Sequence, residues 1–87
     1  MMRVLIPSQL RSYTHGASEI AGTGATLEEL TRNLDAAFPG IRFRIIDEQD
    51  RIRRHIRVFV NGEQANALAV SLAPSDEVQI VGALTGG

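Results

Sequence analysis

The sequence contains no cysteine, and all nine of its basic residues are arginine, so it has no lysine either. The absence of cysteine excludes disulfides, a thiolate nucleophile and a cysteine-based metal site. The absence of lysine removes an amine nucleophile, because arginine keeps its proton. A chain lacking both groups would not acylate its own side chains if its C-terminus became an activated ester, but a genome-wide bias toward arginine is the better explanation of the composition.

Long apolar runs and an excess of charge are also missing. No run approaches the length of a membrane span, and no signal-peptide pattern opens the chain. The formal net charge of −1 argues against nucleic acid or an anionic membrane as the main partner. Eighty-seven residues allow one two-layer core. We therefore expect one cytoplasmic globular domain.

The N-terminal half predicts two strands and one helix. The apolar run 2–6 indicates a strand, and a weaker strand fits residues 17–21 after a loop-like connection. Thr26 and Glu29 form a capping-box pattern that begins a helix, and Pro39 follows its end. Leucines recur through this segment at helical spacing, so the helix carries an apolar stripe that has to lie on a sheet.

Residues 41–57 fit two structures. Ile41, Phe43 and Ile45 alternate with arginines, which favours an extended segment. The residues Ile41, Ile45 and Ile46 also fit one short helical turn. Both alternatives stay open.

The C-terminal half predicts a firm strand over 56–60, ended by an Asn61-Gly62 hairpin signal, and a last strand over 77–81. The alanine-rich stretch 63–71 predicts a loop or a short helical turn, and a short strand is expected at Leu72. A helix on one face of a mixed sheet of about four to five strands is an α+β arrangement.

Phe59 is the one large aromatic side chain expected on the outer face of the sheet, opposite the helix. Such a side chain is a candidate for binding a partner. The alternative is that residues 41–53 fold over it, and the two interpretations carry equal weight.

Side-chain chemistry gives no convincing active site. The glycines of 22–24 precede a helix, but the segment lacks the lysine and spacing of a phosphate-binding loop and is interpreted as a turn. His15 and His55 stand alone, and the acidic residues of 47–50 fit a solvated turn. We expect no metal site and no bound cofactor.

The last six residues, 82–87, read Gly-Ala-Leu-Thr-Gly-Gly. Fully extended, they reach about 20 Å beyond a domain that spans residues 1–81. Two glycines without Cβ atoms let a backbone enter a narrow slot in another protein. The carboxylate of Gly87 is a poor electrophile, so its chemistry needs an ATP-consuming partner. The alternative is a frayed terminus with no role.

Several short motifs, spread in order along the whole chain, are similar to those of the MoaD/ThiS sulfur carriers, which have the ubiquitin-like β-grasp fold. They are the opening strand with Pro7, the helix start at 25–30, the segment 37–41, the strand and turn at 56–63, the segment 74–78, and Thr85-Gly86-Gly87 at the end. The resemblance implies a β-grasp domain with a C-terminal Gly-Gly tail at 82–87.

The resemblance also implies a function as a carrier, not an enzyme. A ubiquitin-activating-enzyme-like partner would use ATP to adenylate Gly87, next to Gly86, and sulfur would then convert it to a thiocarboxylate for a sulfur-acceptor synthase. Phe59, Leu84 and Thr85 would contact partners. The length and the insertion at 42–54 resemble the molybdopterin-synthase small subunit or the cysteine-synthesis carrier more than the thiamin carrier, and the residues before the tail weaken the molybdopterin assignment.

Two other functions remain open. The chain could be a ubiquitin-like modifier that forms isopeptide bonds through Gly87. It could also be a non-catalytic β-grasp interaction module whose tail does nothing.

Overall fold

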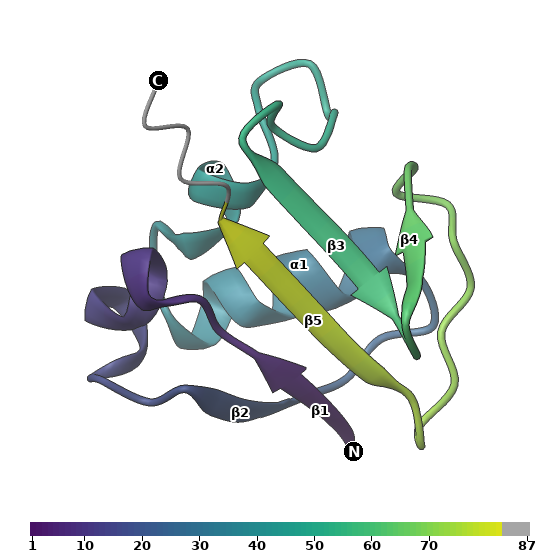
Figure 1. The fold of residues 1–87 in the computed structure, drawn as a ribbon, viewed down its shortest axis with the longest axis horizontal. Coiled ribbons are helices and arrows are strands. Elements are labelled where there is room, and N and C mark those ends of the chain that lie inside the picture. Colours follow the sequence, from purple (N-terminus) through teal and green to yellow (C-terminus); the bar gives the residue numbers. More distant parts are fainter. Residues whose placement is uncertain (83–87) are drawn as a thin grey trace.

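The computed structural model describes residues 1–82, which form five strands and three short helices around one core (Figure 1). In chain order the elements are β1 (Met2–Leu5), the 3-10 helix η1 (Ser8–Thr14), β2 (Glu19–Gly22), α1 (Leu27–Ala37), α2 (Ile41–Ile45), β3 (Ile56–Val60), β4 (Glu63–Ala65) and β5 (Glu77–Gly82).

The strands form one mixed sheet in the order β2-β1-β5-β3-β4, so β5 lies at its centre. β5 runs parallel to β1, with Val78 opposite Val4, and antiparallel to β3, with Ile80 opposite Val58. The predicted strands 2–6 and 56–60 are confirmed, and β5 continues one residue beyond the predicted end, through Gly82.

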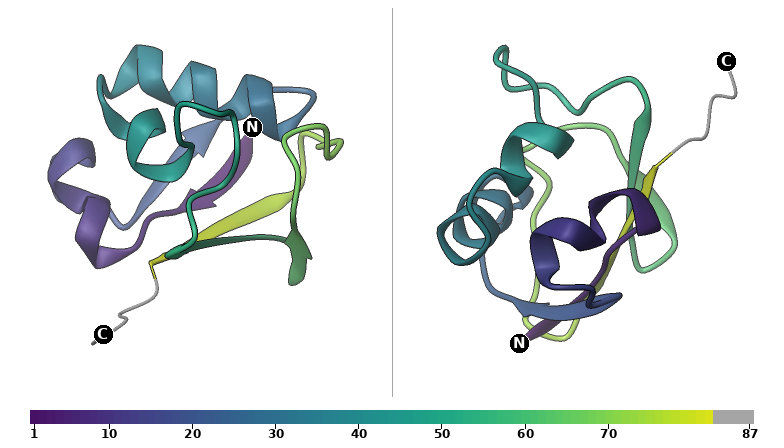
Figure 2. Two further views of the ribbon diagram at one scale, coloured as in Figure 1. Left: turned by 90° about the horizontal axis from the view of Figure 1, so that it is seen from above. Right: turned by 90° about the vertical axis from the view of Figure 1, so that its left-hand side faces the viewer.

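The helix α1 lies across one face of the sheet, which gives the predicted α+β arrangement (Figure 2). The capping box is present: Thr26 Oγ1 accepts a hydrogen bond from the amide of Glu29 at 3.2 Å, and the Glu29 carboxylate accepts one from the amide of Ala25 at 3.0 Å. Leu30 and Leu34 are fully buried against the sheet. The leucine stripe therefore forms the centre of the core, as the spacing predicts.

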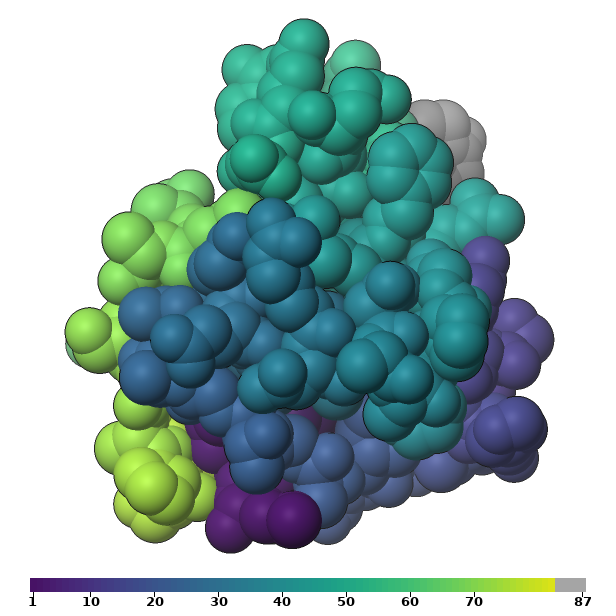
Figure 3. Space-filling view, turned by 180° about the vertical axis from the view of Figure 1, so that it is seen from behind, coloured from purple at the N-terminus to yellow at the C-terminus, as the bar shows by residue number. Residues whose placement is uncertain are grey.

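The short helix α2 shows that the helical alternative for residues 41–46 is correct. Ile41 and Ile45 lie one turn apart, and both are fully buried, as is Ile46. Phe43 points outward and is 55% exposed. The segment is helical because the isoleucines can pack on α1 together only at this spacing. From behind, the core is covered by α1 and by the segments before and after it (Figure 3).

Two loop predictions and one strand prediction are wrong. Residues 9–14, predicted as loop, belong to η1, where Leu10 and Thr14 are buried. The stretch 63–71, predicted as a loop or helical turn, begins with β4, which completes the hairpin with β3. Leu72 is not in a strand, and its amide donates to the carbonyl of Ala25 next to α1.

The turn at 22–24 is made by glycines because the chain passes close to α1. A Cβ on Gly22 would lie 2.6 Å from Leu30 Cδ1, and a Cβ on Gly24 would lie 2.6 Å from the Leu30 amide nitrogen. Gly24 also has φ of +151°. These glycines therefore serve the packing of strand against helix, as the turn interpretation requires.

The Asn61 and Asp76 side chains tie the β3–β4 turn to the start of β5. Asp76 accepts hydrogen bonds from Asn61 Nδ2 at 2.9 Å and from the amide of Ala73 at 2.8 Å. Asn61 Oδ1 accepts from the amide of Glu77 at 3.0 Å. The hydrogen bonds that Asp76 accepts hold its pKa below its ordinary value. The bond from the Ala73 amide has the largest effect, and the bond from the Asn61 side chain has the next largest.

This network predicts an acid-sensitive contribution to stability. Because the pKa of Asp76 is lower in the folded state, ionised Asp76 stabilises the fold. This stabilisation is complete above the unfolded-state pKa of about 4 and is lost as the pH falls through the folded-state pKa. We expect Asp76→Asn to lower the free energy of unfolding near neutral pH and to lose this deficit in acid. Urea unfolding at several pH values measures it, and an equal deficit at every pH would contradict the assignment.

Candidate functional site

The candidate site is the end of β5, where the chain leaves the centre of the sheet. Val81 lies opposite Arg57 and Gly82 opposite Ile56. The predicted site residues Leu84, Thr85, Gly86 and Gly87 lie outside the described residues. What the structure places is therefore the root of the predicted tail, between β3 and the start of η1.

Gln9 of η1 contacts this root. Its Nε2 donates a hydrogen bond to the carbonyl of Gly82 at 3.2 Å. A Cβ on Gly82 would lie 2.9 Å from atoms of the same amide group, so glycine permits the close approach. Sequence reasoning missed Gln9, because it lies in a segment predicted as loop and no motif marks it.

Phe59 lies on the outer face of the sheet, as predicted. Its neighbour Val58 is part of the buried core, and Val60 packs against that core. Phe59 is half-buried on the opposite face of the sheet. The alternative, that residues 41–53 cover it, is wrong, because that segment places Ile45 and Ile46 in the core on the helix side. Phe59 is therefore available at the surface.

The strand register places Phe59 in a short apolar row. Phe59 lies opposite Gln79, and Gln79 lies opposite Leu5 on the next strand. Val81 points to the same face two residues further along β5. The outer-face row, defined as Leu5, Phe59 and Val81 around Gln79, thus leads toward the root of the tail. It offers a small apolar contact surface next to the predicted reactive end.

Ion pairs border this row at the far end of the strands. Arg3 contacts Glu19 and Glu77, each at 3.0 Å. The hydrogen bond from Arg3 holds the pKa of Glu19 below its ordinary value. Because these carboxylates are already paired, they are occupied in local contacts and do not form a catalytic pair.

Within residues 1–82, no group of three His, Cys, Asp or Glu side chains is arranged to hold a metal ion. Asp47, from the acidic turn, accepts hydrogen bonds from the amides of Gln49 and Arg51 at 2.8 and 3.0 Å, so it stabilises its own turn. The hydrogen bond from the Arg51 amide has the largest effect in holding the pKa of Asp47 below its ordinary value. Among the described helices, none is long and apolar enough to cross a membrane.

Solved structures share this fold. The crystal structure of Mycobacterium tuberculosis CysO matches with a TM-score of 0.91 and 30% identity, covering 97% of this chain and 100% of the other. A chain of the Amycolatopsis orientalis BexX/CysO complex matches with a TM-score of 0.92 and 30% identity over the full length of both. The crystal structure of the small archaeal modifier protein SAMP1 from Haloferax volcanii matches with a TM-score of 0.80 and 25% identity, covering 99% of this chain and 98% of the other. The fold is the ubiquitin-like β-grasp.

Sequence comparison agrees with the structural similarity. The curated sulfur carrier protein CysO of Mycobacterium tuberculosis is 33% identical over 89 residues, covering 97% of this chain and 96% of the relative. The sequence model of the ThiS family matches residues 4–87. This match includes the Gly-Gly motif as well as the described domain. The predicted family is therefore confirmed, and the chain belongs to the ThiS family.

Proposed function

We propose that this protein is a sulfur carrier that delivers sulfur from a thiocarboxylate on Gly87 to an acceptor enzyme. Membership of the ThiS family and the 33% identity to a sulfur carrier protein support this proposal. Among the pathways that the resemblance left open, similarity to the CysO proteins favours cysteine synthesis over molybdopterin synthesis. The protein acts as a carrier for partner enzymes and has no catalytic activity of its own.

The observation that carries the proposal is the position of β5. This strand is held on both sides, by β1 and β3, and it ends at Gly82 with five residues still to follow. A central strand cannot shift without breaking two ladders, so its end is a fixed starting point for the tail. The central position of β5 therefore supports the proposal that the domain presents the chain end to a partner.

The chemistry proceeds in two steps. The Gly87 carboxylate attacks the α-phosphorus of ATP in the active site of a ubiquitin-activating-enzyme-like partner, and pyrophosphate leaves. A sulfur donor at the oxidation level of sulfide then attacks the acyl carbonyl, and AMP leaves as the thiocarboxylate forms. The chain has no cysteine, so this sulfur has to come from outside. The carrier itself binds no cofactor in this scheme.

Intact-mass spectrometry tests the proposal. The protein is produced together with its activating enzyme and a sulfur source, and separately without the enzyme. We expect one oxygen to be replaced by one sulfur only in the first sample, with the change located in the C-terminal fragment. An unchanged mass with an enzyme that does adenylate the chain would contradict the sulfur-carrier function.

Phe59 is expected to contribute to binding the activating partner. Truncating a half-buried aromatic side chain at the centre of a small interface commonly weakens binding about five- to tenfold. Phe59→Ala should therefore raise KM in the adenylation assay by about that factor and leave kcat nearly unchanged. Phe43→Ala is the matched control, because it removes a surface phenylalanine side chain from α2, away from the outer-face row. An unchanged KM for Phe59→Ala would show that partners bind elsewhere.

A second function, as a protein modifier, is favoured by the similarity to the small archaeal modifier protein SAMP1. In this case the activated Gly87 would form isopeptide bonds with lysines of other proteins. Immunoblots of cells that express a tagged chain would then show a ladder of heavier conjugates, lost when Gly86 and Gly87 are removed. A single band would leave sulfur transfer as the function.

A further inference from the structure

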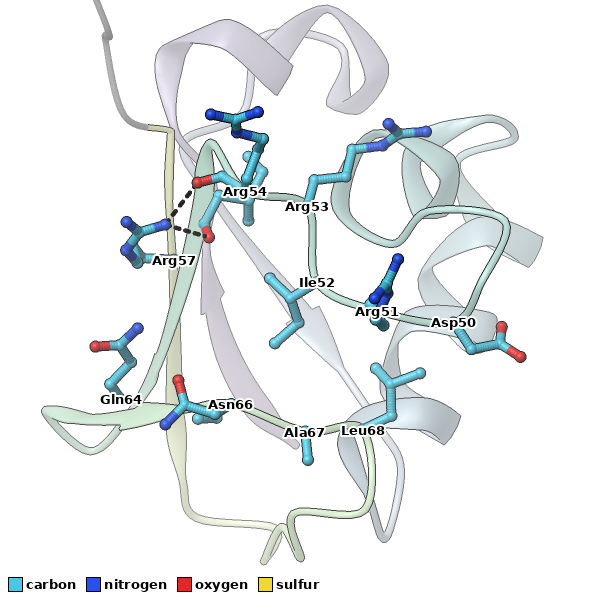
Figure 4. Close-up of a pocket in the computed structure, with 12 residues that line it drawn as sticks. Asp50, Arg51, Ile52, Arg53, Arg54, Arg57, Gln64, Asn66, Ala67 and Leu68 are labelled. Atoms are coloured by element: carbon cyan, nitrogen blue, oxygen red, sulfur yellow. Dashed lines mark hydrogen bonds between the residues drawn. The ribbon is translucent and has the colours of Figure 1, made fainter.

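A groove of about 400 Å³ lies beside the start of β3, on the side of the domain away from η1 (Figure 4). One bank is the loop that leads into β3, and the other is the end of β4 with the residues after it. Its lining includes Ile52, Arg54, Arg57, Asn66 and Leu68. Neither the family resemblance nor the proposed chemistry uses this groove.

The floor of the groove is apolar. Ala65 and Ile56 are buried beneath it, and Ile52 and Leu68 are half-buried and pack on the core. Figure 4 shows the Ile52 side chain pointing toward the opposite bank, where Leu68 lies. One apolar side chain of a ligand could therefore be accommodated between the banks.

Both banks are fixed by backbone hydrogen bonds. The amide of Arg53 donates to the carbonyl of Ile45 at 2.9 Å, and Ile52 forms a β-bridge with Ile46. On the other bank, the carbonyl of Leu68 accepts from the amide of Glu28 at 3.0 Å, which anchors it to the start of α1. The groove is thus part of the folded domain and needs no rearrangement to form.

The rim carries positive charge without matching carboxylates. Within residues 1–82, Arg54 and Arg57 form no ion pair, and the hydrogen bonds of Arg57 go to backbone carbonyls. The Arg53 guanidinium turns away from the groove and lies 4.4 Å from the centroid of the Phe43 ring (Figure 4). Asp50, the one acidic residue in the lining, contacts Arg42 at 3.5 Å. The protein as a whole has a net charge of −1, so the positive charge here is a local excess.

The groove lies next to the root of the tail. Arg57 is opposite Val81, and Ile56 is opposite Gly82, across neighbouring strands that are about 4.8 Å apart. A protein that holds the chain beyond Gly82 is therefore close enough to contact the Arg57 end of the groove at the same time.

We propose that the groove binds an acidic segment of the partner that receives the tail. The carboxylates of this segment would pair with the guanidinium groups of Arg54 and Arg57, and an apolar side chain would lie over Ile52 and Leu68. Arginine forms bidentate hydrogen bonds with carboxylates, which gives such contacts direction as well as charge. The identity of the partner rests on the proposed function, whereas the ligand chemistry rests on the groove alone.

The test is a titration of the isotope-labelled protein followed by amide NMR. The probe is the capped peptide Glu-Asp-Leu-Asp-Glu, and the matched peptide is Gln-Asn-Leu-Asn-Gln. We expect the acidic probe to shift the amides of Ile52, Arg54, Ala67 and Leu68, and the neutral peptide to have little effect. Raising the salt concentration should weaken the binding.

The double variant Arg54→Gln/Arg57→Gln should weaken binding of the acidic probe about three- to tenfold, the range for two exposed ion pairs. Arg32→Gln is the control, because Arg32 lies on α1 and pairs with Glu28. Absent shifts, shifts centred on other arginines, equal binding of both peptides, or the same shifts with inorganic phosphate would each overturn the proposal. A failure of adenylation would affect only the proposed function, since the titration needs no enzyme.

Discussion

Removing Gly86 and Gly87 is expected to abolish adenylation and thiocarboxylate formation completely, while the midpoint of thermal unfolding stays within about 1–2 °C of the intact protein. The loss follows because the new terminal residue, Thr85, has a Cβ and a carboxyl group two residues short of the activating site. The fold should persist because the five strands and the core described within residues 1–82 do not include Gly86 or Gly87. Mass spectrometry and differential scanning calorimetry of both proteins measure the two effects.

The variant Gly86→Ala/Gly87→Ala is the matched control for length. It keeps the carboxyl group at the same distance from β5 but adds two methyl groups, so it should be adenylated slowly, not at zero rate. This comparison separates the effect of tail length from the effect of adding side chains at the last two positions. Full activity of the truncated chain would favour the third function, an interaction module without a reactive end.

Leu30→Ala is expected to lower the free energy of unfolding by about 3 kcal/mol, the range for truncating a fully buried leucine. Leu30 is 0% exposed and lies where α1 meets the turn at Gly22 and Gly24. Gly22 brings the backbone of β2 against the Leu30 side chain, and Gly24 lies against the Leu30 backbone, so the surroundings have little freedom to fill the cavity. Urea unfolding followed by circular dichroism measures the change.

Leu5→Ala is the matched control, because Leu5 lies on the outer face of the sheet and is only half-buried. Leu5→Ala should lower the free energy of unfolding by less than half as much as Leu30→Ala, because Leu5 buries less apolar surface in the folded protein. Equal effects of the two variants would mean that the outer face is packed as tightly as the core, against the arrangement described here.

The sequence predicted the elements whose signals are local and strong. The capping box at Thr26 and Glu29, the leucine spacing of α1 and the Asn61-Gly62 turn all involve residues within four positions of each other. Such local patterns predict the structure correctly because the hydrogen bonds and contacts behind them form between residues that are close in sequence. Phe59 was placed correctly by strand alternation alone.

The errors lie where contacts between distant segments decide the structure. β4 has only three residues, two of them polar, at the start of the alanine-rich stretch 63–71, and it is a strand because β3 pairs with it. The segment 41–46 is not an error, because its sequence leaves both an extended and a helical structure open, and packing against α1 selects the helical spacing of its isoleucines. Gln9 contacts Gly82 across 73 positions of sequence, which no local pattern can indicate.

The same limit applies to the candidate site. The Gly-Gly motif and the family resemblance identified the predicted reactive end without any structure. The arginine-lined groove could not be predicted, because it combines residues near 54 with residues near 66, and only the β3–β4 hairpin brings them together. Charge alone gave no hint, since the chain as a whole is almost neutral.

The central claim is that the reactive group is the terminal carboxyl of Gly87. ATP–pyrophosphate exchange catalysed by the activating enzyme tests it most directly, with two semisynthetic forms of the protein that differ only in having a free carboxyl or a carboxamide at that position. The claim predicts exchange with the free carboxyl and none with the carboxamide. Equal exchange with both forms would contradict it.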